Sequence, residues 1–95
     1  MSAISEHPNT AVFHNGISYC YGRLGDFSKA IQEGRVAVDL DPLNHLYLTD
    51  LGWTLVEAGQ YSEAGIVLKK AVDLSPPGYD LAKNNLEELR RLRTE

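Results

Sequence analysis

A chain of 95 residues with 43% hydrophobic content is suited to one layered core and offers little material for a second domain. Its 13 acidic and 9 basic residues give a net charge of -4, which argues against a surface of clustered Lys and Arg for nucleic acid or an anionic membrane. The single cysteine, Cys20, cannot form an internal disulfide, and the sequence shows neither a signal peptide nor an apolar run for a membrane span. We therefore expect a cytoplasmic protein.

The first half of the chain predicts two helices joined by a tight turn. After a tail at residues 1–10, the first helix is expected over about 11–24, where Gly25 ends it. The second helix is expected over about 27–40. It carries Gly34 in its middle, where glycine costs about 1 kcal/mol relative to alanine, so this position marks either a close approach of another backbone or a soft spot.

The second half predicts another helix pair and one further helix. The second helix stops before a proline, and Asn44 can cap the third helix, expected over about 45–58. Gly59 suits a left-handed position at the end of that helix, and the fourth helix follows over about 61–74. A fifth helix over about 79–92 carries leucines on one face, which would cover the last apolar layer of the core.

The two halves are related by an internal repeat with a period of 34 residues. Sliding residues 11–44 onto residues 45–78 requires no gap, and prolines 8, 42 and 76 stand at the same phase. The matched positions include Gly25 on Gly59, Ser28 on Ser62, Ala30 on Ala64, and residues 37–40 on 71–74. A fixed period of this length is typical of stacked helical hairpins.

This repeat resembles the tetratricopeptide (TPR) family, whose 34-residue unit carries a characteristic order of large apolar residues, small residues and a final proline. The resemblance covers residues 11–78, and the first copy departs from the family pattern at His14, Ser18 and Gly34. The second copy supplies the pattern as Leu48, Leu51, Gly52, Leu55, Ala64, Leu68, Ala71 and Pro76. Gly52 is expected to face Ala64, because helices approach within about 8–10 Å only where side chains are short.

The resemblance implies an all-α fold of five helices, in which antiparallel helix hairpins stack as a right-handed αα superhelix, a TPR-like solenoid. On this interpretation residues 11–44 form the first repeat and residues 45–78 the second. Residues 79–95 form a C-terminal solvating helix. Residues 1–10 are an N-terminal tail or the end of a missing preceding repeat.

The chain offers no combination of residues that predicts catalysis or metal binding. His7, His14 and His45 share no metal-ligand spacing with Cys20, and no nucleophile, base and orienting group can be assembled. We expect no enzyme, no cofactor and no metal. His14 is expected to be a partly buried structural histidine, and Cys20 a small apolar residue without reactivity.

The resemblance also implies a binding surface, because the first helices of successive TPR hairpins line a concave groove that holds a peptide or helix of a partner protein. Tyr19 and Trp53 stand at the same phase of the repeat, so we expect both rings on this wall. The alternative is that they pack on each other in the core. Carried over by phase, the groove wall consists of Val12, Asn15, Tyr19, Arg23, Leu46, Thr49, Asp50, Trp53, Val56 and Glu57.

The expected function is therefore a protein–protein interaction module that binds another protein, without catalysis and without nucleic-acid or membrane binding. The alternative is a structural, self-associating repeat unit or a fragment of a longer TPR array. The observation behind this alternative is an apolar stripe on the first helix. In an array a preceding helix would cover this stripe, and when uncovered it is expected to mediate a homo-oligomer. The stripe has i, i+4, i+7, i+11 spacing and consists of Phe13, Ile17, Cys20 and Leu24.

Some relatives bind the C-terminal carboxylate of chaperones through Lys, Asn, Asn, Lys and Arg at fixed groove positions. By the same phase, those positions are here Asn15, Tyr19, Asp50, Asp80 and Asn84. Two carboxylates thus stand where cations or a neutral amide would be needed. We predict that this chain does not bind such an acidic terminus, since repulsion replaces charge-assisted hydrogen bonds.

Overall fold

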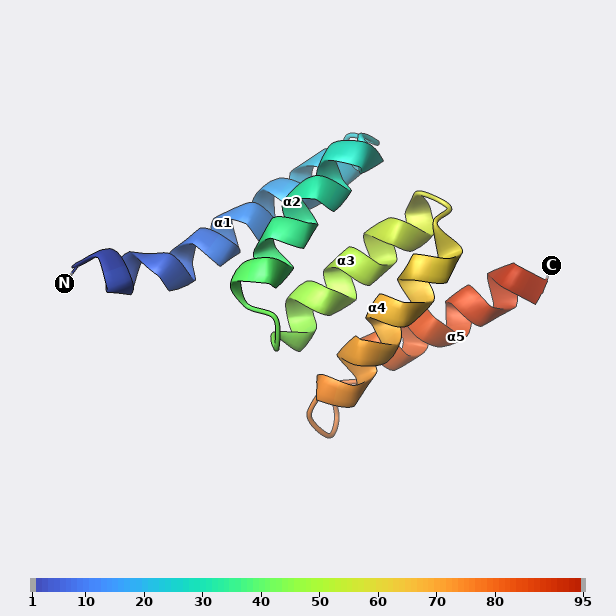
Figure 1. Cartoon of the computed structure of the whole chain (residues 1–95). Coiled ribbons are helices and arrows are strands. Elements are labelled where there is room, and N and C mark those ends of the chain that lie inside the picture. Colours follow the sequence, from blue (N-terminus) through green and yellow to red (C-terminus); the bar gives the residue numbers. More distant parts are fainter. Residues whose placement is uncertain (1, 95) are drawn as a thin grey trace.

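The computed structural model describes the backbone of residues 2–94 and the side chains of residues 10–94. Figure 1 shows successive antiparallel helices, which form two hairpins followed by a last helix. The described residues form α1 (Ser2–Arg23), α2 (Phe27–Leu40), α3 (His45–Glu57), α4 (Tyr61–Leu74) and α5 (Leu81–Thr94). The prediction of an all-α helical repeat fold is confirmed.

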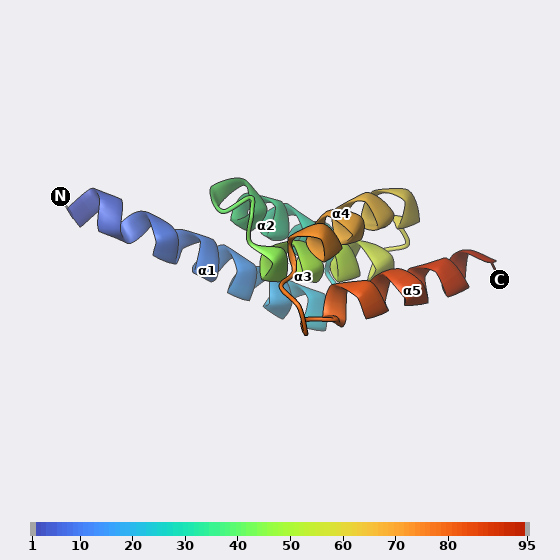
Figure 2. The same cartoon turned by 90° about the horizontal axis from the view of Figure 1, so that it is seen from below.

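The helices form two layers, which Figure 2 shows from the side. α1, α3 and α5 lie in one layer, and α2 and α4 lie in the other. α3 is the central helix, because it contacts each of the other four. Among the described residues, no helix is both long enough and apolar enough to cross a membrane.

The helix boundaries agree with the sequence signals except at the start of the chain. α2 and α4 have the expected bounds, α3 ends at Glu57, and α5 begins at Leu81. α1 begins at Ser2, well before the expected start near residue 11, so the expectation that the helix starts there was wrong. Pro8 lies inside α1, where a proline lacks the backbone N–H and its ring crowds the preceding turn, but the helix continues through it.

Local caps explain why the second and third helices begin where they do. The side-chain oxygen of Asn44 accepts hydrogen bonds from the backbone N–H of Leu46 at 2.9 Å and of Tyr47 at 3.2 Å, as the sequence predicted. Asp26 caps α2 in the same way, since its carboxylate accepts from the N–H of Lys29 at 3.2 Å. Gly59 has a φ of 81°, in the left-handed region expected for the end of α3.

The core is built from the residues that define the repeat. Ala30 and Ala64, which stand at the same phase, are both fully buried where the helices of each hairpin cross. α5 packs against α4, and its residues Ala82 and Leu89 are buried. The pattern residues of the second repeat that are buried are Leu48, Leu51, Gly52, Leu55, Ala64, Leu68 and Ala71.

Leu68, rather than the expected Ala64, supplies the atoms nearest to Gly52. A Cβ at position 52 would lie only 2.5 Å from Leu68 Cδ2. Gly34 is buried under a neighbouring side chain rather than a backbone, since a Cβ there would lie 3.1 Å from Leu51 Cδ1. Ser18 is also buried, and its hydroxyl donates to the carbonyl oxygen of Ala30 at 2.6 Å, which ties α1 to α2.

Candidate functional site

A surface groove lies between α1 and α3, the first helices of the two hairpins. Its volume is about 300 Å³. The α3 residues that line it follow Asp50 at i+3, i+4 and i+7, a spacing that places their side chains on one face of the helix. We call it the α1–α3 groove. It is lined by Asn15, Ser18, Tyr19, Gly22, Arg23, Asp50, Trp53, Thr54 and Glu57.

Two polar contacts organise the walls of the groove. Asn15 Nδ2 donates to Asp50 Oδ2 at 3.2 Å, which joins α1 to α3 across the groove. Arg23 Nη1 donates to the Tyr19 hydroxyl at 3.1 Å, and the guanidinium carbon lies 5.9 Å from the centre of the Tyr19 ring. The amide of Asn15 and the guanidinium of Arg23 therefore already have partners within the chain.

The carboxyl of Asp50 has a shifted pKa, although its side chain is exposed on the groove wall. Burial raises the pKa of its carboxyl above the usual value, and the hydrogen bond from Asn15 opposes this rise only in part. In the part of the chain that the structure describes, no cation pairs with Asp50 or with Glu57. The groove therefore presents two carboxylates that lack a counter-ion.

The two aromatic residues of the groove differ in burial. Tyr19 is 65% exposed, so its ring stands on the surface of α1. Trp53 is half-buried, because part of its ring packs against the core cluster that includes Leu51 and Leu55. The structure therefore brings the two rings to one groove instead of packing them on each other in the core.

Four residues of the predicted wall lie elsewhere. Thr49 and Val56 are 3% and 5% exposed, so placing their side chains on the groove surface was wrong. The Thr49 hydroxyl donates to the carbonyl oxygen of His45 at 2.6 Å, while Val56 belongs to the main core cluster. Val12 and Leu46 are exposed, but neither lines the groove.

Three lining residues were absent from the predicted wall. Gly22 follows the predicted residue Tyr19 by one helical turn, and Thr54 follows the predicted residue Asp50 by one turn. Including the next turn on the same helix face would have predicted both. Ser18 was noted only as a departure from the family pattern. Its hydroxyl is buried against α2, yet the residue forms part of the groove floor.

A second, strongly apolar depression lies on another face of α1. Phe13 is 66% and Leu24 79% exposed, and Ile17 and Cys20 are exposed as well. We call the set Phe13, Ile17, Cys20 and Leu24 the α1 stripe. The stripe is uncovered in the described structure, and Val12, Gly16 and Tyr21 flank it.

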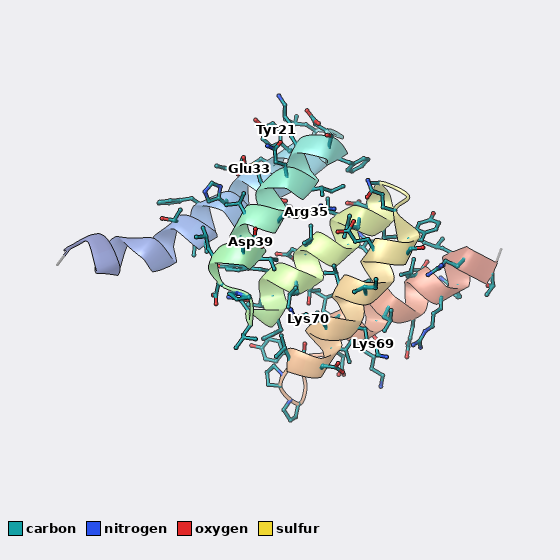
Figure 3. All side chains as sticks on the ribbon, viewed as in Figure 1. Tyr21, Glu33, Arg35, Asp39, Lys69 and Lys70 are labelled. Atoms are coloured by element: carbon teal, nitrogen blue, oxygen red, sulfur yellow. The ribbon has the colours of Figure 1, made fainter. Side chains whose placement is uncertain are left out.

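His14 has a structural contact. Its Nδ1 lies 2.6 Å from Glu33 Oε1, which links α1 to α2, and both side chains are partly buried as expected for His14. Figure 3 shows Glu33 on α2 together with Arg35 and Asp39. Among the described residues, no group of three or more His, Cys, Asp or Glu side chains could hold a metal ion.

Comparison with known proteins identifies the repeat. Residues 46–77 match the family model described as "Tetratricopeptide repeat". One similar solved structure is the first TPR of Spaghetti (RPAP3) bound to the HSP90 peptide SRMEEVD, with a TM-score of 0.81 and 20% identity over 93% of this chain and 71% of that chain.

A second similar structure is the Sgt2 TPR domain from Aspergillus fumigatus. The TM-score is 0.84 and the identity 23%, over 99% of this chain and 63% of that chain. The present chain thus spans less than two thirds of that domain. At such identities the likeness shows the fold.

Proposed function

We propose that this chain is a protein-interaction module of the tetratricopeptide-repeat kind, because residues 46–77 match the model of that family and the fold is shared with TPR domains. The α1–α3 groove binds a short peptide or helix of a partner protein, and the chain has no catalytic role. A neighbour of the same fold, the first TPR of Spaghetti, is bound to a peptide, which supports this class of partner.

The observation that carries the proposal is the placement of Tyr19 and Trp53 in one groove. Aromatic side chains are enriched among the residues that dominate binding energy, because they bury a large area at low entropic cost. Both rings are reachable from solvent, although Trp53 is anchored in the core on one side. The groove therefore offers one exposed and one half-buried aromatic surface to an apolar anchor of the partner.

The proposed absence of catalysis has support in the chemistry of the groove. Its hydroxyl groups are either committed to backbone carbonyls, as in Ser18 and Thr54, or hydrogen-bonded to a cation, as in Tyr19. None of these lining residues is paired with a general base. Asp50, whose carboxyl has a raised pKa, contacts an amide that cannot accept its proton.

The test is selection of a displayed random peptide library on the immobilised protein. We expect enrichment of peptides whose binding is lost in Tyr19→Ala and kept in Phe13→Ala. Phe13 is a matched control, since it is also an aromatic residue of α1 and is 66% exposed against 65% for Tyr19. No enrichment, or peptides that are lost with Phe13→Ala instead, would contradict the proposal.

A second candidate function, self-association as a repeat unit, is favoured by the exposure of the α1 stripe. Ile17 stands at the phase of Leu51, and Leu51 packs against Gly34 of α2, the second helix of the preceding hairpin. The stripe is therefore the face that a second helix from another hairpin would cover. A second copy of this chain is the occupant that this alternative requires.

A further inference from the structure

The two repeats differ in what stands beside their groove aromatic. In α1, Arg23 follows Tyr19 by four residues, and its guanidinium lies over the Tyr19 ring. In α3, the residue at the matching position, four after Trp53, is Glu57. Where the first repeat supplies its own cation to the aromatic ring, the second repeat supplies a carboxylate.

A second carboxylate flanks Trp53 from the other side. Asp50 precedes Trp53 by three residues, so Asp50, Trp53 and Glu57 lie on one face of α3 and all line the groove. The only side-chain partner of Asp50 is the neutral amide of Asn15 at 3.2 Å, and Glu57 has no partner among the described residues. The single cation of the groove, Arg23, is committed to Tyr19.

Neighbouring cations of α5 do not fill this position. Lys83 and Arg91 stand at the phases of Thr49 and Glu57, but neither lines the groove. Arg91 instead pairs with Glu88 on its own helix. The place beside Trp53 that would suit a cation is therefore left open by the described part of the chain.

From this arrangement we propose that the α1–α3 groove binds a lysine or arginine side chain of the partner peptide, with its alkyl stem on Trp53 and its cationic head between Asp50 and Glu57. The proposal rests on the proposed function and names the chemistry of the partner. The alkyl stem of a lysine or arginine packs on an apolar ring face while its head stays polar, and a carboxylate gives that head a charge-assisted hydrogen bond.

Size and solvation agree with a single long side chain. Ligand pockets span about 300–1,000 Å³, and the groove lies at the lower end with about 300 Å³. Partial desolvation raises the pKa of Asp50, yet its side chain is exposed on the groove wall, so a cation can reach this carboxylate. An arriving cation supplies the charge that the groove lacks.

The test uses two blocked heptapeptides that differ in one group. Each has leucines on both sides of the central residue, which is arginine in one peptide and its neutral isostere citrulline in the other. Trp53 is the only tryptophan of the chain, so its fluorescence reports directly on the groove. We expect the arginine peptide to bind about tenfold more tightly than the citrulline peptide, the equivalent of about 1.4 kcal/mol.

Two carboxamide variants check the origin of this preference. Asp50→Asn keeps an acceptor for Asn15 and is expected to remove most of the preference for arginine. Asp73→Asn, which changes an exposed carboxylate on α4 outside the groove, is expected to leave it intact. Urea unfolding of both variants confirms that the fold is retained.

Equal or tighter binding of the citrulline peptide overturns the proposal, and so does a preference that survives in Asp50→Asn. Absence of binding by both peptides overturns it as well. The library selection on Tyr19→Ala and Phe13→Ala does not depend on peptide charge. Its outcome therefore shows whether the proposed function falls together with this inference or stands without it.

Discussion

Leu51 of α3 fills the space that Gly34 leaves open in α2, with Leu51 Cδ1 3.1 Å from the position that a Cβ on Gly34 would occupy. The second repeat inverts this arrangement. Its glycine, Gly52, lies in the first helix of the hairpin and makes room for Leu68, which stands at the phase of Gly34. The first hairpin therefore depends on a side chain of the next repeat to complete its core.

Gly52→Ala is expected to destabilise the protein by about 1–3 kcal/mol, because the new methyl group overlaps Leu68 at 2.5 Å in a packed core. Gly65→Ala is the matched control. Its Cβ would lie 3.6 Å from Leu89 Cδ2, an ordinary contact, so the better helix propensity of alanine should stabilise the protein by about 0.5–1 kcal/mol. Urea unfolding followed by circular dichroism measures both. A Gly52→Ala protein as stable as Gly65→Ala would disprove the close contact.

Asp50→Asn is expected to be more stable than the parent protein at pH 7. Burial raises the folded-state pKa of Asp50 above its usual value of 3.8, so the folded protein holds this proton more tightly than the unfolded chain. Ionisation of Asp50 therefore costs stability above the folded-state pKa, and this cost disappears as the pH falls below about 3.8.

The measurement is the difference in urea midpoint between Asp50→Asn and the parent protein at several pH values. The difference should favour the variant at pH 7 and shrink toward zero near pH 3. Other carboxylates titrate in the same range, but they are common to both proteins and cancel in the difference. A variant that is less stable at pH 7 than the parent would show that ionised Asp50 is stabilising instead.

The peptide SRMEEVD, found in the structure of the neighbouring TPR of Spaghetti, is expected to show no micromolar binding to this chain in calorimetry. Asp50 presents a carboxylate inside the groove, and the amide of Asn15 is already engaged by it. A second carboxylate, Asp80, stands at the start of α5, where its carbonyl oxygen accepts from the N–H of Asn84 at 2.8 Å. Saturable binding of SRMEEVD would contradict this expectation.

Phe13→Glu tests the alternative of self-association through the α1 stripe. If the stripe pairs two copies, the mass of the parent protein in light scattering should rise with concentration, and Phe13→Glu should remain monomeric. Ile66→Glu is the control, since Ile66 is 72% exposed on α4 and lies away from the stripe. A parent protein that stays monomeric at high concentration excludes this alternative, as does an oligomer that Phe13→Glu leaves unchanged.

The sequence predicted the helices well wherever a local stop signal stands between them. Gly25, Gly59 and the Asn44 cap fixed the ends of the inner helices to within a residue or two. Pro8 stands before residue 11 but does not interrupt α1, so the start of α1 was misplaced. Helix boundaries are therefore predictable only as far as turn residues mark them.

The groove was predicted only in part, because α3 contacts four other helices. α3 buries more of its circumference than an amphipathic surface helix does. The position of an α3 residue in the repeat therefore does not tell whether its side chain lines the groove or lies in the core. Thr49 and Val56 are the predicted groove residues of α3 whose side chains are buried by the neighbouring helices. The contacts of Asn15 and Arg23 depend on side-chain geometry across and along helices, which a repeat pattern does not encode.

Amide chemical-shift mapping by NMR with a library-selected peptide shows most directly whether the α1–α3 groove is the partner-binding surface. We expect the largest changes at Asn15, Tyr19, Asp50 and the indole N–H of Trp53. Changes confined to the α1 stripe, or to the α2 and α4 layer that carries Arg35 and Lys70 in Figure 3, would contradict it.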